Sequence, residues 1–156
     1  MTSDTRESVL QNGQVDAVFA TYTITDERKK LVSFAGPYYY TQQAILVLAD
    51  NDNIKSVDDL ADKNVAVQSG SNGPAILEEF APKASQQEFK TDEEARQALQ
   101  QGRVDAYVID NNMQQSALVR EPGKYKIRRQ ALRQQGALWY RPAARFRRRR
   151  LCQRLP

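Results

Sequence analysis

The stretch from residue 20 to residue 28, ATYTITDER, places hydroxyl groups and one guanidinium where they could bind an anion. Thr25 is in position to cap a helix, which puts Arg28 in the first turn, near Thr21 and Thr23. A guanidinium beside hydroxyls and free backbone N–H groups can hold a carboxylate through two parallel hydrogen bonds. The alternative is an ion pair between Arg28 and the neighbouring acids on a wet surface.

The loop from Gln68 to Pro74, QSGSNGP, is a second candidate for anion binding. It is rich in serine, glycine and asparagine, and Pro74 suits the first turn of a helix that we expect to end at Phe80. Unpaired N–H groups at such a helix start, with the side chains of Ser69 and Asn72, would face an anion. The loop matches neither the P-loop pattern nor the dinucleotide fingerprint, so an ordinary turn is the alternative.

Asp110 follows the apolar segment 104–109, which we expect to be a buried strand. Its carboxylate, beside the amides of Asn111 and Asn112, could hold an ammonium group, although Asp110 could equally cap the helix expected at 113–118. With the carboxylate clamp and the loop, it would complete a site for an amino-acid zwitterion. An aromatic wall, a hinge lining and half-buried packing are the roles open to three consecutive tyrosines, Tyr38, Tyr39 and Tyr40.

Alternating strand-like and helix-like segments must position these residues. The expected strands are the short runs at 15–19, 44–49, 64–68, 86–89 and 104–109. Helix start signals lie between them, including a cap at Ser56 and a capping box at Thr91. The alternation predicts an α/β fold with a parallel or mostly parallel sheet, whose ligands gather at the carboxyl ends of the strands. The segments 10–23 and 99–112 share a helix end, a glycine stop and a strand, which suggests two similar lobes.

The composition excludes several classes of site. The chain has no histidine and a single cysteine, Cys152, so it cannot form a His-based catalytic triad, a His-ligated zinc site or a disulfide within one chain. We therefore expect no metal and no cofactor. No apolar run approaches the roughly 18 residues that span a membrane. The N-terminus lacks a signal-peptide pattern, so the chain as written would remain cytoplasmic.

Charge is distributed unevenly along the 156 residues. Residues 1–127 contain 13 basic and 19 acidic side chains, whereas residues 128–156 contain ten arginines and no acidic side chain. So abrupt a change calls for separate interpretations of the two regions. A basic arm for nucleic acid or anionic lipid is one interpretation of the second region.

Three motifs, in this order and spacing, make residues 5–127 resemble a known family: TYTITDERKKLVSFAGPYYYTQQAILV, IKSVDDLADKNVAVQSGSNG and GRVDAYVIDNN. The chain resembles the family-3 extracellular solute-binding proteins, the amino-acid receptors of ABC importers, and is most similar to the glutamate/glutamine/aspartate-binding branch. This resemblance implies the type II periplasmic-binding fold, in which two hinged lobes close around the ligand. The closed form is what the membrane permease recognises.

The resemblance also implies roles for individual residues. Thr23 and Arg28 match the ligands of the α-carboxylate, and Thr21 matches a neighbouring backbone contact. Asp110 matches the acid that takes the α-ammonium. The second-lobe loop corresponds to Ser69, with Gln68 and Asn72 nearby, and the first hinge crossing corresponds to residues 38–43, which begin with Tyr38, Tyr39 and Tyr40.

By the same resemblance the chain has three parts. Residues 1–42 would be a remnant of the first lobe with the first hinge crossing, and residues 43–127 would be the second, α/β lobe. Residues 128–156 would be a non-homologous tail, disordered or poorly packed. Most of the first lobe would lie upstream of Met1, so we expect this fragment to bind its ligand weakly or not at all.

The arginine-rich tail can be explained by a change of reading frame. Read one base later, permitted codons for residues 128–156 can encode a family-like continuation that includes the sequence YGIGLP. Part of this match is fixed, because Trp139, Tyr140 and Arg141 must then give glycine followed by isoleucine or threonine. We therefore expect a one-base frame change near codons 127–128, in preference to a basic arm, and no nucleic-acid partner.

These features together predict a non-enzymatic binding module. It would be the extracytoplasmic solute-binding component of an ABC importer for a polar or acidic amino acid such as glutamate or glutamine. The intact protein would be periplasmic or a cell-surface lipoprotein, monomeric, and partnered by permease subunits. The alternatives are a cyclohexadienyl-type dehydratase on the same fold, for which Asp110 is the available acid, and the ligand-sensing input domain of a membrane receptor.

Overall fold

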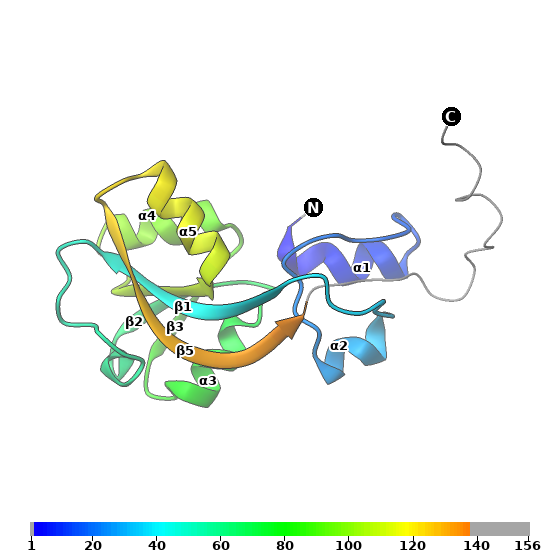
Figure 1. Ribbon diagram of the computed structural model, residues 1–156, viewed down its shortest axis with the longest axis horizontal. Helices are drawn as coiled ribbons and strands as arrows, with labels where there is room; N and C mark the ends of the chain where they lie inside the picture. The colour runs from blue at the N-terminus through cyan, green and yellow to red at the C-terminus, as the bar shows by residue number, and fades with distance from the viewer. Residues whose placement is uncertain (1, 138–156) are drawn as a thin grey trace.

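The computed structural model describes residues 2–137, which form one α/β body with a smaller N-terminal unit beside it (Figure 1). Helices and strands alternate along most of this range. In chain order the elements are η1 (Ser3–Thr5), α1 (Arg6–Gln11), α2 (Asp26–Leu31), β1 (Tyr40–Leu48), η2 (Asp58–Leu60), β2 (Asn64–Gln68), α3 (Gly73–Phe80), β3 (Ser85–Phe89), α4 (Asp92–Gln100), β4 (Ala106–Asp110), α5 (Asn111–Arg120) and β5 (Tyr125–Ala137).

The sheet is mixed rather than mostly parallel. Its strand order is β3-β2-β4-β1-β5, and β2 runs parallel to β3 and β4. Strand β1 runs antiparallel to both β4 and β5, so the prediction of a mostly parallel sheet is wrong for half of the strand pairs. Because β1 runs the opposite way, its beginning lies where β4 ends, and Gln43 is paired with Asp110.

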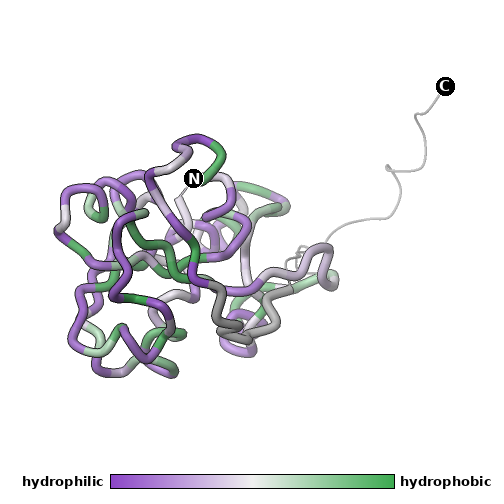
Figure 2. The backbone as a smooth tube through the Cα atoms, turned by 60° about the vertical axis from the view of Figure 1, so that its left-hand side comes forward, coloured by the Kyte–Doolittle hydropathy of each residue, from purple (hydrophilic) through white to green (hydrophobic). Residues whose placement is uncertain are grey.

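Apolar side chains alternate across the strands and pack on both faces of the sheet. On one face Ile45, Val65 and Val108 pack with residues of α3 and of the segment before β2, such as Ile76 and Leu60. The opposite face is covered by α4 and α5, and its buried side chains include Leu46, Ala66, Ala95, Leu99 and Tyr107. The period of two along each strand therefore builds a three-layer arrangement, whose interior contains the apolar stretches of the chain (Figure 2).

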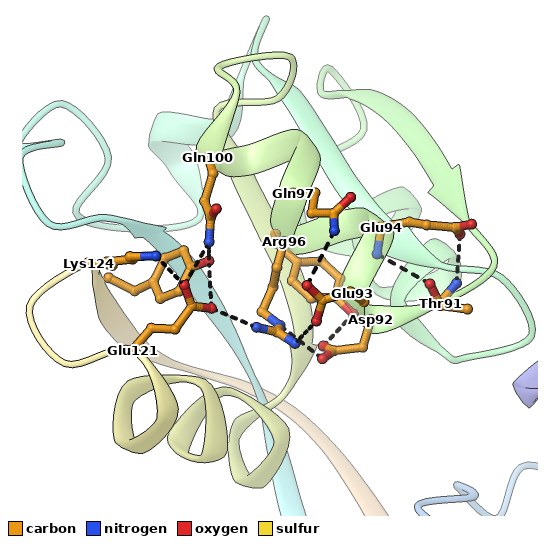
Figure 3. Close-up of polar contacts among 11 residues, drawn as sticks. Thr91, Asp92, Glu93, Glu94, Arg96, Gln97, Gln100, Glu121 and Lys124 are labelled. Atoms are coloured by element: carbon orange, nitrogen blue, oxygen red, sulfur yellow. Dashed lines mark hydrogen bonds and ion pairs between the residues drawn. The ribbon is translucent and has the colours of Figure 1, made fainter.

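A buried arginine fixes α4 to the end of α5 (Figure 3). Arg96 is 5% exposed, and its guanidinium contacts the carboxylates of Asp92 at 2.9 Å, Glu93 at 2.6 Å and Glu121 at 2.9 Å. The predicted capping box of α4 is confirmed, because the Thr91 hydroxyl accepts from the backbone N–H of the third helical residue, whose carboxylate accepts in return. The helix therefore has a capped start and a fully paired charge in its middle.

The N-terminal unit, residues 2–39, lies beyond one end of β1 and β5 and away from α4 and α5 (Figure 1). The strand predicted at 15–19 is wrong: these residues form no strand, and Phe19 is 71% exposed although Val18 is buried. The sequence-similar segment 104–109 becomes β4 because it lies between β1 and β2, whereas the described residues offer 15–19 no such partners. An apolar run forms a strand only where another strand can pair with it.

Two further elements differ from their predictions. The helix expected after Ser56 is only the single turn η2, where the Asp59 carboxylate accepts from the backbone N–H groups of Lys55 and Ser56. The expected boundary after residue 127 is not a structural boundary, because β5 continues through Ala137 and pairs with β1 along its length. Residues 128–137 of the expected tail are thus part of the sheet, and residues 138–156 lie outside the described residues.

The pairing of β1 with β5 is irregular near the site. Tyr40 is paired with Ala137 and Leu48 with Tyr125, but the register shifts on both sides of Gln43. Such bulges bend a strand and leave its ladder locally incomplete.

Among the described residues, no helix has the length and apolar character needed to cross a membrane.

Candidate ligand-binding site

Arg28 connects the N-terminal unit to the sheet. Thr25 caps α2 by accepting from the backbone N–H of Arg28 at 3.2 Å, which places the guanidinium at the first turn as predicted. Its Nη1 donates to the Thr23 carbonyl at 3.0 Å, and its Nη2 donates to the Gly70 carbonyl at 2.9 Å. The side chain is only 12% exposed, so Arg28 is not the solvated surface residue of the alternative interpretation.

Tyr22 and Glu7, which the sequence pattern did not indicate as site residues, both contact the Arg28 guanidinium. The guanidinium carbon lies 4.3 Å from the centre of the Tyr22 ring, and Nε lies 3.5 Å from the Glu7 carboxylate. The Tyr22 hydroxyl donates to the same carboxylate oxygen. Burial and this bond to Glu7 raise the pKa of Tyr22 above its ordinary value, so the hydroxyl keeps its proton at neutral pH. Arg28 therefore has a fixed orientation before any ligand arrives.

Asp110 lies in a buried polar group with Gln43 and Asn72, each less than a tenth exposed. The Gln43 Nε2 donates to the Asp110 carboxylate at 2.6 Å and to the Asn72 side-chain carbonyl at 2.9 Å. Gln43 Oε1 is buried and has no partner among the described residues. Asp110 occupies the N-cap position of α5, yet its side chain makes no capping hydrogen bond. The carboxylate is therefore bonded to Gln43 of β1 rather than to the start of α5.

Burial raises the pKa of Asp110 to about 6, and the positive charges of Arg6 and Arg28 act in the opposite direction. Arg6 and Arg28 thus act on Asp110 electrostatically and favour its charged form. At neutral pH the carboxylate is mostly ionised and incompletely compensated. A ligand cation would relieve this cost by supplying a charged hydrogen-bond donor.

The loop before α3 approaches the N-terminal unit very closely. Gly70 has φ +71°, and a Cβ there would lie 2.5 Å from the Cα of Asp4. The carbonyl of Gly70 accepts from Arg28, while the Asn72 side chain joins Gln43. The loop thus brings together parts of the chain that are about 40 to 70 residues apart in sequence, as the pairs Arg28–Gly70 and Asp4–Gly70 show.

Comparison with known proteins identifies the family. Residues 1–107 match the bacterial extracellular solute-binding proteins, family 3. The chain belongs to this family. The glutamate-binding protein GluB of Corynebacterium efficiens is 35% identical over 123 residues, which cover 78% of this chain and 42% of that protein. The glutamine-binding protein GlnH of an ABC transporter in Bacillus subtilis is 44% identical over 112 residues, which cover 71% of this chain and 41% of that protein.

Solved structures agree with this assignment. An ancestral arginine-binding protein bound to glutamine has a TM-score of 0.86 and 36% identity, and the likeness covers 93% of this chain and 65% of that one. The predicted type II periplasmic-binding fold is therefore confirmed. This family-3 chain spans about two fifths of the length of the curated relatives it matches.

The remaining predicted site residues of this solute-binding protein lie at different places. Thr21 offers its carbonyl to Arg6, at 2.8 Å, and Thr23 is 4% exposed with its carbonyl on Arg28. Ser69 donates its backbone N–H to Phe89 at 2.8 Å, and the Gln68 amide lies 3.5 Å from the carbonyl of the next residue after Phe89. Thr23 therefore lies with Arg28. The backbone N–H of Ser69 and the side-chain amide of Gln68 instead point toward β3 and the residue that follows it.

The three tyrosines of the predicted hinge differ in environment. The Tyr38 hydroxyl donates to the Ala20 carbonyl at 3.1 Å, within the N-terminal unit. Tyr39 is 46% exposed and Tyr40, the first residue of β1, is 67% exposed. All three tyrosines lie on the connection between the N-terminal unit and β1, where the family resemblance predicts a hinge.

Proposed function

We propose that this chain carries part of the amino-acid site of an importer's solute-binding protein. Arg28 binds the α-carboxylate and Asp110 binds the α-ammonium. The observation that carries the proposal is the convergence of an oriented guanidinium and a buried carboxylate from the two parts of the chain. Each has a polar support, Glu7 for the cation and Gln43 for the acid, so both charges are positioned in advance.

The neighbouring residues complete this proposed site. Thr21 and Thr23 lie on the side of Arg28, and Asn72 lies on the side of Asp110. Gln68 and Ser69 belong to the same second-lobe loop and contribute its shape. Residues 1–42 act as first-lobe material with the first hinge crossing, and residues 43–127 act as the second lobe, so that closure brings both charges onto one ligand.

The ligand class and the partners follow from the family. Relatives named for glutamate and glutamine support a polar or acidic amino acid. The ABC transporter named for one of them supports permease subunits as partners, and the family description supports an extracytoplasmic location for the intact protein. We propose in addition that the intact protein is a monomer. We propose a binding protein in preference to a dehydratase or a receptor input domain. The contacts of Glu7 with Arg28 and of Gln43 with Asp110 hold both charged groups in place, which suits ligand binding.

Titration of the 156-residue chain with amino acids, followed by NMR and calorimetry, tests this function. Arg28→Met should weaken binding of the favoured amino acid at least tenfold, as expected on losing a hydrogen bond between charged groups. The matched control is Lys29→Met, on the same helix but 55% exposed, which should leave affinity within about twofold. Unchanged affinity in Arg28→Met would contradict the proposal. If this chain binds too weakly to measure, the same comparison is made on a protein that also contains the rest of the first lobe.

A second variant separates the two ends of the ligand. Asp110→Asn should weaken binding of the amino acid but not of the same molecule without its amino group, because only the former presents an ammonium. Equal losses for both molecules would mean that Asp110 has a structural role alone.

A further inference from the structure

Gln43 is a buried amide that joins three parts of the fold: β1, β4 and the loop before α3. Its side chain is 3% exposed. The Nε2 nitrogen donates to the Asp110 carboxylate at 2.6 Å and to Oδ1 of Asn72 at 2.9 Å. Both N–H groups of this nitrogen are thus used, whereas Oε1 is buried without a partner among residues 2–137.

The orientation of the Gln43 amide fixes the orientation of the Asn72 amide. Because Asn72 accepts through Oδ1, the nitrogen of its side chain is the end that is not bonded to Gln43. Within the part of the chain that the structure describes, the two N–H groups of this nitrogen have no acceptor. The site therefore offers an acceptor at Asp110 and unused donors at Asn72.

The reverse orientation of Gln43 suits only the other charge state of Asp110. With the amide turned over, Oε1 would face the Asp110 carboxylate and Oδ1 of Asn72, and three acceptors would meet without a donor. Once Asp110 is protonated, the acid can donate to Oε1, and Asn72 can turn to donate through its nitrogen. The observed orientation thus belongs to an ionised Asp110 and to an Asn72 with unused N–H groups.

We propose that Gln43 is a positioning residue that sets the polarity of the ligand site. Its nitrogen keeps Asp110 as a charged acceptor and turns Asn72 so that the N–H groups of Asn72 remain for an oxygen of the ligand. The inference rests on the proposed function, in which Asp110 takes the ammonium. Since a hydrogen bond to the charged form of an acid lowers its pKa, Gln43 opposes the effect of burial on Asp110.

The other titratable groups that act on Asp110 keep their charge over the pH range of interest. Arg6 of α1 and Arg28 of α2 favour its charged form, and a guanidinium stays protonated in proteins. Asp110 acts in turn on Tyr107 of β4, but burial raises the pKa of this phenol, which therefore stays neutral. A changed titration of Asp110 in a variant of Gln43 would thus report on the bond between these two residues.

The test is an NMR titration of the Asp110 carboxyl in the ligand-free chain, which needs no binding. Gln43→Met is close in size but has no donor, and it should raise the pKa of Asp110 by about one unit, as expected on losing a hydrogen bond to a charged group. Gln43→Glu should raise this pKa further, because a second acid disfavours the charged form of the first. The matched control is Gln42→Met, at the exposed neighbouring position of β1, which should leave the pKa unchanged.

Binding gives a second readout that a purely structural role would not move. A rise of about one unit from a pKa of about 6 lowers the ionised fraction of Asp110 about fivefold at pH 6 but hardly at all at pH 8. Relative to the wild-type chain, Gln43→Met should therefore weaken binding of L-glutamine about fivefold more at pH 6 than at pH 8. Glutaramic acid, the same molecule without its amino group, should show no such difference. The measurement is calorimetry on the same protein as in the test of the proposed function.

An Asp110 that titrates alike in the wild-type chain and in Gln43→Met overturns the inference, whatever the chain binds. Rapid solvent exchange of either Nε2 proton of Gln43 in the wild-type chain also overturns it, and this measurement stands even if no variant folds. Equal weakening of L-glutamine and glutaramic acid at both pH values overturns it as well, because Gln43 would then be a structural residue alone. If Asp110→Asn leaves the recognition of the ammonium intact, the proposed function fails, whereas the titration result for Gln43 is unaffected.

Discussion

Replacing Gly70 by alanine tests whether direct contact between the N-terminal unit and the sheet holds the site together. The new Cβ would lie 2.5 Å from both the Cα and the backbone nitrogen of Asp4, so no side-chain rotation can relieve the clash. The two parts must move apart, and the bond from Arg28 to the Gly70 carbonyl, 2.9 Å long, is lost. That bond to a charged donor is worth about 1.5–3 kcal/mol.

The left-handed backbone of residue 70 adds a second cost. Its φ of +71° costs a non-glycine residue about 1 kcal/mol. The total for Gly70→Ala is therefore about 2.5–4 kcal/mol. Gly102 is the matched control, because its φ is +68° and a Cβ there meets nothing within 4 Å. Gly102→Ala should cost only the backbone term, about 1 kcal/mol.

The assay is urea unfolding of both variants, together with hydrogen exchange of the amides in η1, α1 and α2. Gly70→Ala should lose about 1.5–3 kcal/mol more than Gly102→Ala, or should lose exchange protection in the N-terminal unit while β2 and β4 keep theirs. Equal stabilities for the two variants, with the N-terminal amides still protected, would refute the reasoning that Gly70 permits this contact.

Three more predictions concern single side chains. Arg96→Met should lower the free energy of unfolding by about 2–3 kcal/mol in urea titration, because it leaves three neighbouring carboxylates without their cation. Equal or greater stability of Arg96→Met would contradict this. Burial raises the folded-state pKa of Asp110 to about 6, above its unfolded value, so the contribution of Asp110 to stability should fall as pH rises from about 4 to 6. The stability of Asp110→Asn relative to the wild-type chain should therefore rise over this range, by about 2 kcal/mol, and stay higher at pH 8 in urea titration. Tyr22→Phe removes the hydroxyl bonded to Glu7, should cost about 1 kcal/mol in thermal unfolding, and should weaken carboxylate binding by Arg28 more than it weakens binding of an α-amide analogue.

Local signals in the sequence predicted the strands and caps that depend on neighbouring residues. The segment 64–68 is β2, and the capping box at Thr91 starts α4, because an apolar run or a cap acts over a few residues. The direction of β1 was not predictable, since it depends on which strands lie beside it. The failure at 15–19 and the extension of β5 to Ala137 have the same cause: pairing partners decide them, and composition does not.

The site shows the same division between local and distant signals. Arg28 and Asp110 were singled out in the sequence because Arg28 lies in the first turn of α2 and Asp110 lies at the junction of β4 and α5. Gln43 was missed, because only the antiparallel pairing of β1 with β4 brings it to Asp110. Arg6 and Glu7 lie in a short polar segment ahead of a glycine turn. Nothing in that segment indicated that they contact Thr21 and Tyr22, 15 positions later in the sequence. Such partners are set by tertiary packing.

The irregular pairing of β1 with β5 has a mechanical consequence. Two hydrogen-bonded strands form a ribbon that resists stretching and sliding, so rotation of the N-terminal unit must come from bending. The register shifts on both sides of Gln43 make the ribbon weakest there. Because the Gln43 side chain is bonded to Asp110, bending of β1 at that point would also move the hydrogen-bond donor of Asp110. A movement of the N-terminal unit and a change at the acid would therefore influence each other through a single strand position.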